Sequence, residues 1–442
     1  AFTDWMTDNV AYTRGVNLRT SHIEAYTWAD ETTDGTEQDT PTFFWNSTYN
    51  AIAHANEVLA VIDQFDIRSD EDEAKKSAVR SEALLTRAYA HFMLVNLFAK
   101  HYDDRRSNAD PGIPYVDEPE TVFLKTYKRN TVQEVYDRIE EDMLLGIDLV
   151  DDSFFANSGK YHFNRNAALA FASRFYLFKG EYDKCIEYSN MMLGADPGAF
   201  VRDLTSDQFL NARSSIDGYS QLYTSPDLPS NLLLMRKISL VQRPDFAHGP
   251  TTVLYRDIFA ANPFPSTTDE RENPALVKGE NGVFPLRYQS LFQRRSLNSN
   301  VGTPYHIHIA FRGEEVLLIR MESHVEQNRI NEAIQDMQVL IDRRYSGPSI
   351  PLTIELIREA FGVSGNPFVS DKFVMDIYVQ LERRKEFIVQ GLRWFDIKRF
   401  ELEVEHNQLD GSIIRLDEND RRKVLQIPAS AIEVGELEPN PR

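Results

Sequence analysis

The segment from Asp371 to Phe400, DKFVMDIYVQLERRKEFIVQGLRWFDIKRF, decides the fold of this 442-residue chain. Its apolar residues recur every three to four positions, the spacing that gives an α-helix one buried face. This apolar stripe consists of Val374, Ile377, Tyr378, Leu381 and Ile388. Gly391 has the backbone freedom to leave a helix, so we expect it to end this one. The segment therefore predicts an amphipathic helix that packs on other helices.

Two earlier segments look like copies of one helical hairpin. LFKGEYDKCIEYSNMML starts at Leu177 and VEQNRINEAIQDMQVLI starts at Val325, and the two align without gaps. Gly180 and Asn328 fall at the same position, where a residue in the left-handed region can end the first helix. The small residues that permit close packing also coincide, and they are Cys185 and Ala333. The pattern is typical of tetratricopeptide-like hairpins. Because no regular period of about 34 residues links the copies, we expect degenerate repeats.

The first 150 residues add further helices. Helical spacing runs over 43–65 and again over 77–98, which suggests a second hairpin. A loop should follow, because it contains the three prolines Pro111, Pro114 and Pro119. Thr131 and Glu134 have the spacing of a capping box, so another helix should start there and run to about Val150.

The middle of the chain differs in composition. Residues 198–310 hold nine of the 20 prolines, which excludes long helices and predicts irregular structure with a few short strands. Insertions of this length usually carry function. We therefore predict a mainly α fold: a single domain over 1–442, with a helical scaffold at 43–197 and 311–400 and a loop-rich insertion at 198–310. The Pro-rich tail after it, VLQIPASAIEVGELEPNPR, should lie extended.

Composition narrows the classes of partner. The chain has 68 acidic and 48 basic residues, and its net charge of −20 disfavours nucleic acid and anionic lipid. Cys185 is the one cysteine, so an intrachain disulfide and a cysteine-based zinc cluster are excluded. No apolar run reaches the ~18 residues of a transmembrane helix. Since the sequence begins at Ala1 and not at Met, we expect a signal peptide upstream of it.

The stretch from Glu382 to Arg399, ERRKEFIVQGLRWFDIKR, resembles the SusD/RagB family. The family pattern has a Glu-Arg pair, a further Glu, and then Glu-Gly-x-Arg-Trp-x-Asp-Leu-x-Arg. In this chain Gln390 stands where the pattern has the second acidic residue, and Ile397 stands where it has Leu. The order of residues is otherwise kept.

Other blocks resemble the family in the same chain order. They are WNSTYNAIAHANEVL from Trp45, SEALLTRAYAHFMLVNLFAKHY from Ser81, RNTVQEVYDRIEEDM from Arg129 and FRGEEVLLIRMES from Phe311. Asn130 replaces the usual Asp, and Met321 stands where Ala is common. The resemblance covers most of the chain and is weakest over 198–310.

This resemblance implies a SusD-like lipoprotein on the surface of a Bacteroidetes-type bacterium, attached to the outer membrane through a lipid anchor upstream of Ala1. It further implies a protein that captures a glycan, or a peptide, for a SusC-like TonB-dependent transporter, without catalysis, cofactor or metal. Two alternatives stay open. An all-helical glycoside hydrolase needs only two carboxylates, which so acidic a chain can supply. A generic repeat scaffold for protein–protein interaction is the other.

Sugar capture would use aromatic faces flanked by polar side chains on loops. Trp28 lies in a polar stretch, and Tyr288 and Tyr305 lie in the insertion. Arg287 and Asn298 are the polar neighbours. We predict these five residues as ligand contacts, with ordinary loop packing as the alternative. Trp45 and Trp394 should instead belong to the core, because both sit on or beside the helical blocks.

Three further groups of residues favour a structural reading. Charges at helical spacing near residue 390 should form ion pairs that tie the helix to its neighbours; they are Arg383, Arg384, Glu386, Arg393 and Asp396. In DETTDGTE, from Asp30, positions one, five and six match a calcium loop, but Pro41 stands where a bidentate Glu belongs. His306 and His308 would share one side of a strand, yet no carboxylate stands at a convincing ligand spacing. We find no phosphate loop, Gly-x-Ser-x-Gly elbow or His-Glu-x-x-His helix.

Overall fold

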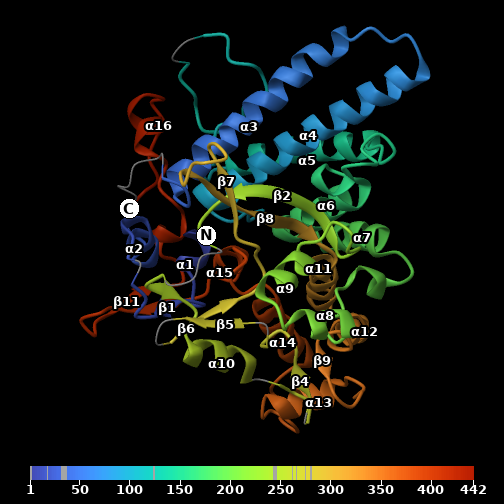
Figure 1. Cartoon of the computed structure of the whole chain (residues 1–442), viewed down its shortest axis with the longest axis vertical. Helices are drawn as coiled ribbons and strands as arrows, with labels where there is room; N and C mark the ends of the chain where they lie inside the picture. Colours follow the sequence, from blue (N-terminus) through green and yellow to red (C-terminus); the bar gives the residue numbers. More distant parts are fainter. Residues whose placement is uncertain are drawn as a thin grey trace. The chain divides into compact units, whose positions relative to one another are not determined.

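The computed structural model describes residues 2–16, 18–30, 37–122, 125–241, 246–260, 262–264, 266–273, 275–278 and 281–442. The chain forms two compact units. Unit 1 consists chiefly of Thr3–Leu18 and Ala172–Arg393, and unit 2 of Arg19–Phe171 and Trp394–Arg442. The single domain over 1–442 stays a prediction. The mainly helical class with tetratricopeptide-like hairpins is confirmed, and the helices of both units are drawn in Figure 1.

Unit 2 contains the first predicted helices. α3 (Pro41–Val61) and α5 (Val132–Leu149) both pack on α4 (Asp70–Phe98). α4 starts seven residues before the apolar pattern, because the side chain of Ser69 caps it and four acidic residues occupy its first turn. The capping box of Thr131 and Glu134 is present as predicted.

The core of unit 2 contains both tryptophans that we assigned to it. Trp45 is 5% exposed and Trp394 is fully buried. Trp394 lies on α15 (Arg393–Arg399). Two small elements were not predicted, the helix α2 (Thr20–Tyr26) and the hairpin of β10 (Val404–Asn407) with β11 (Ile413–Leu416). The tail is mostly irregular, as expected, apart from the short helix α16 (Ala429–Glu433).

Unit 1 contains the two aligned hairpins. α6 (Arg165–Lys179) leads into α7 (Tyr182–Leu193), and α11 (Gly313–Glu326) leads into α12 (Ile330–Ile341). Gly180 and Asn328 both have left-handed backbone, with φ of 77° and 58°, and both end a helix as predicted. The Ser323 hydroxyl lies 2.9 Å from the Cys185 sulfur where α11 packs on α7.

The helix predicted to start at Asp371 and to end at Gly391 is shorter in the structure. α14 spans Asp371–Glu386, follows α13 (Ile354–Ala360) and packs on α11. It ends five residues before Gly391, which instead adopts φ of 80° in the turn that follows. The prediction that Gly391 breaks the helix is therefore wrong. The apolar stripe also needs correction, because Ile377 is 36% exposed. The buried face instead includes paired charges such as Glu382 and Lys385.

The insertion folds into several small sheets and short helices. Its main sheet is antiparallel, with the order β2–β8–β7, formed by β2 (Asn231–Ile238), β8 (Gly302–Arg312) and β7 (Leu291–Arg294). The short helices are α8 (Asp207–Ala212), α9 (Ile216–Tyr223) and α10 (Thr252–Ala260). Among the residues that the structure describes, shorter strands also pair: β1 (Ala11–Tyr12) with β3 (His248–Gly249), β4 (Thr268–Asp269) with β9 (Tyr345–Ser346), β5 (Ala275–Lys278) with β6 (Gly282–Pro285), and β10 with β11.

Within the described part of the chain, no helix combines the length and the apolar character that crossing a membrane would require.

Candidate functional site

The β2–β8–β7 sheet has one face that is covered at one end and open at the other. Leu234 pairs with Ile309, and Ile238 pairs with Tyr305. Residues directly opposite in an antiparallel sheet lie on the same face, as do residues two apart on one strand. All four side chains, and Arg236 between them, therefore share this face, which we call the ligand face.

The inner half of the ligand face packs against α8 and α9. Leu234 and Ile309 belong to a buried cluster with aromatic rings from those helices, namely Phe209, Tyr219 and Tyr223. The sequence of β2 explains the division, because its first four residues are buried and the remainder of the strand is polar or partly exposed. The covered half packs the sheet against α8 and α9, and the outer half reaches solvent.

The outer half brings an aromatic ring together with polar groups. The guanidinium carbon of Arg236 lies 4.3 Å from the centre of the Tyr305 ring, and Arg236 donates a hydrogen bond to the side-chain oxygen of Gln293. Thr303 lies directly opposite Gln293. Tyr305 is half-buried, while Arg236 and Gln293 are exposed. This arrangement offers a ring, a guanidinium, an amide and a hydroxyl to one ligand.

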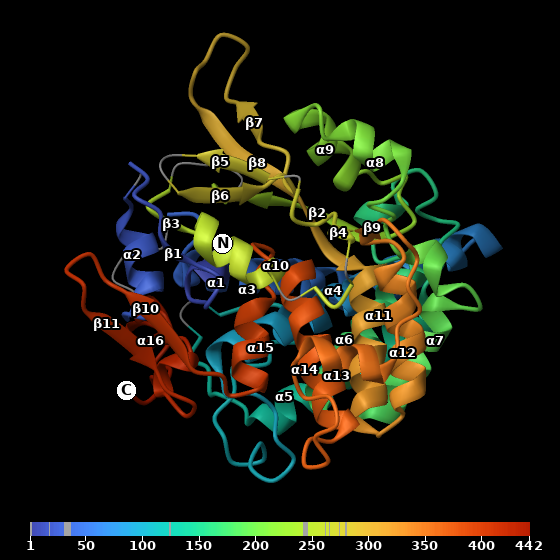
Figure 2. The same ribbon diagram turned by 90° about the horizontal axis from the view of Figure 1, so that it is seen from below.

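Two predicted contacts lie elsewhere on the same hairpin. Asn298 is exposed in the loop that joins β7 to β8, which extends past the other strands of unit 1 (Figure 2). Tyr288 lies just before β7, and its ring is 4.6 Å from the ring of His306. Because His306 neighbours Tyr305 on β8, it points to the opposite face. The structure therefore brings Tyr288, Asn298 and Tyr305 to one hairpin but not to one face.

Arg287 has a structural task that the sequence did not indicate. Its guanidinium is buried and donates hydrogen bonds to the backbone oxygens of Glu386 and Lys385. These are carbonyls at the C-terminal end of α14, which the helix itself leaves without partners. A cation there also interacts favourably with the helix dipole. Arg287 thus caps α14, and the ligand contact predicted for it stays a prediction.

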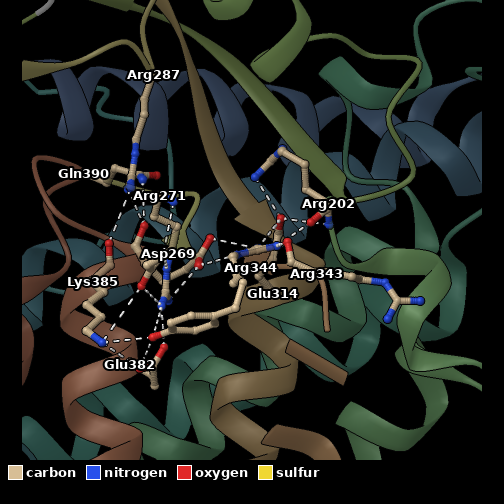
Figure 3. Close-up of polar contacts among 12 residues, drawn as sticks. Arg202, Asp269, Arg271, Arg287, Glu314, Arg343, Arg344, Glu382, Lys385 and Gln390 are labelled. Carbon is tan, nitrogen blue, oxygen red and sulfur yellow. Dashed lines mark hydrogen bonds and ion pairs between the residues drawn. The ribbon is translucent and has the colours of Figure 1, made fainter. Parts of the chain in front are cut away.

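A buried ion-pair network ties the sheet to α14 (Figure 3). Arg202 donates to Asn231 at the start of β2, over 2.6 Å, and to Glu314 on α11, over 2.8 Å. Arg344 links Glu314 to Glu386 on α14. The network continues from Glu386 through the charged side chains of Arg271, Asp269, Glu382 and Lys385.

The network is compensated electrostatically. Burial alone would raise the pKa of Glu386, but Arg344 and Arg271 outweigh it and hold that pKa well below its usual value. Burial would also raise the pKa of Asp269, but Arg271 and Lys385 together hold that pKa below its usual value. The Glu386 and Asp269 carboxylates are therefore ionised. The exposures of Glu314, Glu382, Glu386 and Asp269 range from 0% to 4%, so they lie inside the protein and not at a surface that a substrate could reach.

Ion pairs also form at three of the other charges that we predicted to be structural, Arg384, Arg393 and Asp396. Arg384 and Arg393 both contact Asp8, and the Arg393 pair closes at 2.8 Å. On α15, Asp396 lies 2.9 Å from Arg399.

Trp28 belongs to unit 2 and is 5% exposed. Its ring stacks on His406 of β10, with 4.4 Å between ring centres and 15° between planes. Tyr26 stacks on the same imidazole at 4.0 Å. Trp28 therefore packs against its own unit, and the ligand contact predicted for it stays a prediction.

The possible metal sites receive no support from the geometry. Among the residues that the structure describes, no cluster of three or more His, Cys, Asp or Glu side chains could hold a metal ion. His306 and His308 have ring centres 6.0 Å apart. Burial, aided by Lys237, keeps the pKa of both imidazoles well below the usual value, so they are neutral. In the calcium-like stretch, residues 31–36, Asp34 and Gly35 among them, lie outside the described residues.

A small cavity lies between the β1–β3 and β5–β6 strand pairs. Its volume is about 50 Å³, and its lining includes Trp5, Phe246, His248, Phe284 and Val389. Its lining is mostly apolar and offers few of the polar side chains that bind sugar hydroxyls, so the open ligand face is the better candidate for a glycan site.

Comparison with known families supports the resemblance over most of the chain. A family model described as "Starch-binding associating with outer membrane" matches residues 3–177. The model of the SusD family matches residues 281–431. The stretch between them, which contains most of the insertion, is matched by neither. A search of curated proteins finds no match.

Solved structures share the fold over the whole chain. A SusD superfamily protein from Bacteroides thetaiotaomicron VPI-5482 has a TM-score of 0.70 at 19% identity, covering 100% of this chain and 94% of its own. A SusD-like carbohydrate binding protein from Bacteroides vulgatus ATCC 8482 has a TM-score of 0.69 at 16% identity, with coverages of 98% and 90%. A laminarin binding SusD-like protein has a TM-score of 0.61 at 16% identity, with coverages of 100% and 93%.

Proposed function

This chain belongs to the SusD/RagB family, and from that premise we propose that it is a non-catalytic protein that captures a glycan on its ligand face. The observation that carries the proposal is the half-buried ring of Tyr305 beside the exposed Arg236 and Gln293. The C–H face of a sugar stacks on such a ring, and guanidinium and amide groups bind its hydroxyls. Asn298, in the adjoining loop, is a further proposed contact.

A binding role without chemistry fits the burial of the carboxylates in the ion-pair network of unit 1. Glycoside hydrolysis needs two carboxyl groups on either side of an accessible sugar bond. The carboxylates of the ion-pair network are buried and held by arginines, which makes them supports of the fold. They fix β2 and the start of α11 to α14, and so hold the ligand face rigid. A rigid face binds with less loss of conformational entropy.

The remaining parts of the proposal rest on the family. We propose that the protein is held at the outer membrane of the cell surface by a lipid anchor, and that it passes its ligand to a SusC-like TonB-dependent transporter. Co-purification with the transporter from membranes of the source organism tests this partnership. A peptide in place of a glycan is a second ligand class, which binding experiments separate.

The central test compares binding by the parent protein with binding by Tyr305→Ala. Isothermal titration with the glycan that binds most tightly in an array should show a ten- to hundredfold loss of affinity, or about 1–3 kcal/mol. The matched control is Tyr161→Ala, because Tyr161 is also a partly exposed tyrosine, at 46%, and is not one of the ligand-face residues. It should bind as the parent does. Equal affinity for Tyr305→Ala and the parent would remove the ligand face from consideration.

Catalysis is tested with the same ligand. Incubation of the protein with the bound oligosaccharide should leave the oligosaccharide's mass unchanged in mass spectrometry. Shorter products that accumulate over many turnovers would favour the glycoside hydrolase instead.

A further inference from the structure

The outer half of the β2–β8–β7 sheet is basic within an acidic protein. None of the 68 acidic residues lies between Asn281 and Gly313, the range that contains β7 and β8, although the chain has a net charge of −20. Residues 228–241, which contain β2, are also free of them. The outer half of the sheet and the residue after β7 instead carry four cationic side chains, which we call the basic cluster: Arg236, Lys237, Arg294 and Arg295.

The basic cluster is not neutralised by the described part of the chain. Its three arginines are exposed, and Lys237 is half-buried. No carboxylate of the described residues forms an ion pair with any of the four. Other exposed arginines of the protein do have such partners; Arg415, for example, lies 2.6 Å from Glu405. Neither of the two strand segments contributes a negative charge to the cluster.

Two of these cations belong to the ligand face. Arg236 contacts both the Tyr305 ring and Gln293. The Arg295 amide continues the strand pairing by donating to the Val301 oxygen over 2.9 Å, and alternation along β7 places Arg295 on the face of Gln293. A ligand stacked at Tyr305 therefore meets positive charge as well as hydroxyl-binding groups.

For a ligand bound at the hairpin, the charges of the basic cluster matter more than the net negative charge of the whole chain. At physiological ionic strength the screening length is about 8 Å, so acidic groups on distant surfaces contribute little at the hairpin. An anionic group within hydrogen-bond distance of Arg236 would form charge-assisted hydrogen bonds, which are roughly twice as strong as neutral ones.

We propose that the glycan captured on the ligand face is acidic and carries carboxylate or sulfate groups. This inference rests on the proposed function and adds the chemical class of the ligand to it. Tyr305 receives the apolar face of a sugar ring, and Arg236 and Arg295 receive its anionic groups. A neutral glycan would leave both guanidinium groups without a counter-charge.

The test is an array that carries acidic and neutral glycans together, followed by titration. Polygalacturonate supplies carboxylates alone, κ-carrageenan supplies sulfates alone, and laminarin and starch are neutral. Fully methyl-esterified polygalacturonate is the matched probe, because esterification removes the charge and keeps the backbone. We expect an acidic glycan to bind most tightly, at least tenfold more tightly than its uncharged form. Raising NaCl from about 50 to 300 mM should weaken this binding.

Substitutions then test whether Arg236 binds the anionic groups of the glycan. Arg236→Gln should weaken acidic-glycan binding at least tenfold while the unfolding temperature stays that of the parent. Arg415→Gln, at an exposed and paired arginine, should bind normally. Binding of neutral glycans alone, or unchanged acidic-glycan affinity in Arg236→Gln, would overturn the acidic class and leave the proposed function intact. Binding of no glycan of either kind would overturn the proposed function itself.

Discussion

Arg344 and Glu386 form a two-point ion pair inside unit 1, with Nε 2.8 Å and Nη2 3.0 Å from the two carboxylate oxygens. Both side chains are buried, at 0% and 1% exposure. Arg344 comes from the turn after α12 and Glu386 is the last residue of α14, so the pair joins two helical hairpins. Two charges taken from water are stable only while each has the other.

Glu386→Gln should therefore destabilise the protein strongly. The substitution keeps the shape of the side chain but leaves Arg344 with an uncompensated buried charge on this side. Breaking one partner of a buried pair costs about 3–5 kcal/mol of unfolding free energy. Chemical denaturation followed by circular dichroism measures the loss.

The matched control is Glu405→Gln, which breaks the exposed pair of Glu405 with Arg415. Exposed pairs contribute about 0–1 kcal/mol, so the denaturation midpoint should hardly move. Equal midpoints for the two variants would show that the network is not the main link between the sheet and α14.

Trp394→Ala should also destabilise the protein, through lost packing. The Trp394 ring is fully buried, and truncation of so large a core side chain costs about 3–5 kcal/mol. Trp394→Phe, which leaves a smaller void, should lose less. Thermal unfolding should give the highest melting temperature for the parent, a lower one for Trp394→Phe and the lowest for Trp394→Ala. A parent-like melting curve for Trp394→Ala, together with lost ligand binding, would mean that the residue serves the ligand and not the core.

Lys398 predicts a pH dependence of stability. Its amino group is buried, lies 2.8 Å from the Ala99 oxygen and also contacts the Asn96 oxygen. Burial lowers its pKa from the usual 10.5 to about 7. Between these two values the unfolded chain binds one more proton here than the folded chain, so stability rises with pH.

The measurement compares the parent with Lys398→Met, which lacks the titrating group. Between about pH 7 and pH 9 the unfolding free energy of the parent should rise relative to that of the variant, by at most about 1.4 kcal/mol per pH unit. Urea denaturation of both proteins at pH 7 and at pH 9 measures this difference. A constant difference across this range would mean that the folded protein keeps Lys398 charged.

Local sequence signals predicted the local structure well. The capping box of Thr131 and Glu134 and the left-handed residues Gly180 and Asn328 depend on neighbours within a few positions, and all of them hold. The end of α14 was misplaced, because Arg287 caps its last carbonyls from about a hundred residues away. The sequence around Gly391 gives no indication of a capping residue so distant in the chain.

Buried charged residues explain why the apolar stripe of α14 was predicted incorrectly. An apolar stripe through Ile377 assumes that charged residues face solvent, yet Glu382, Lys385 and Glu386 are buried and paired. Ile377 is instead 36% exposed. The ligand face was unpredictable for a similar reason. Tyr305 could be named from its loop position, but Arg236 comes from a strand that pairs with it across about 70 residues of chain.

A packing role and a ligand-binding role for Trp28 predict opposite effects of Trp28→Ala on stability and on glycan affinity. The ring is buried against His406, and the backbone at Trp28 is left-handed, with φ of 51°, just after α2. Tyr26 stacks on the same imidazole, so removing the indole opens one side of that ring stack and leaves a void.

We expect Trp28→Ala to lower the unfolding free energy by about 3–5 kcal/mol, as other large core truncations do, and to bind the glycan with the parent's affinity. Trp28→Phe should restore part of the stability, because a smaller ring can still stack on His406. Calorimetric unfolding and glycan titration must be done on the same samples at a temperature where every variant is folded. A Trp28→Ala protein that melts like the parent but binds at least tenfold more weakly would establish Trp28 as a ligand contact.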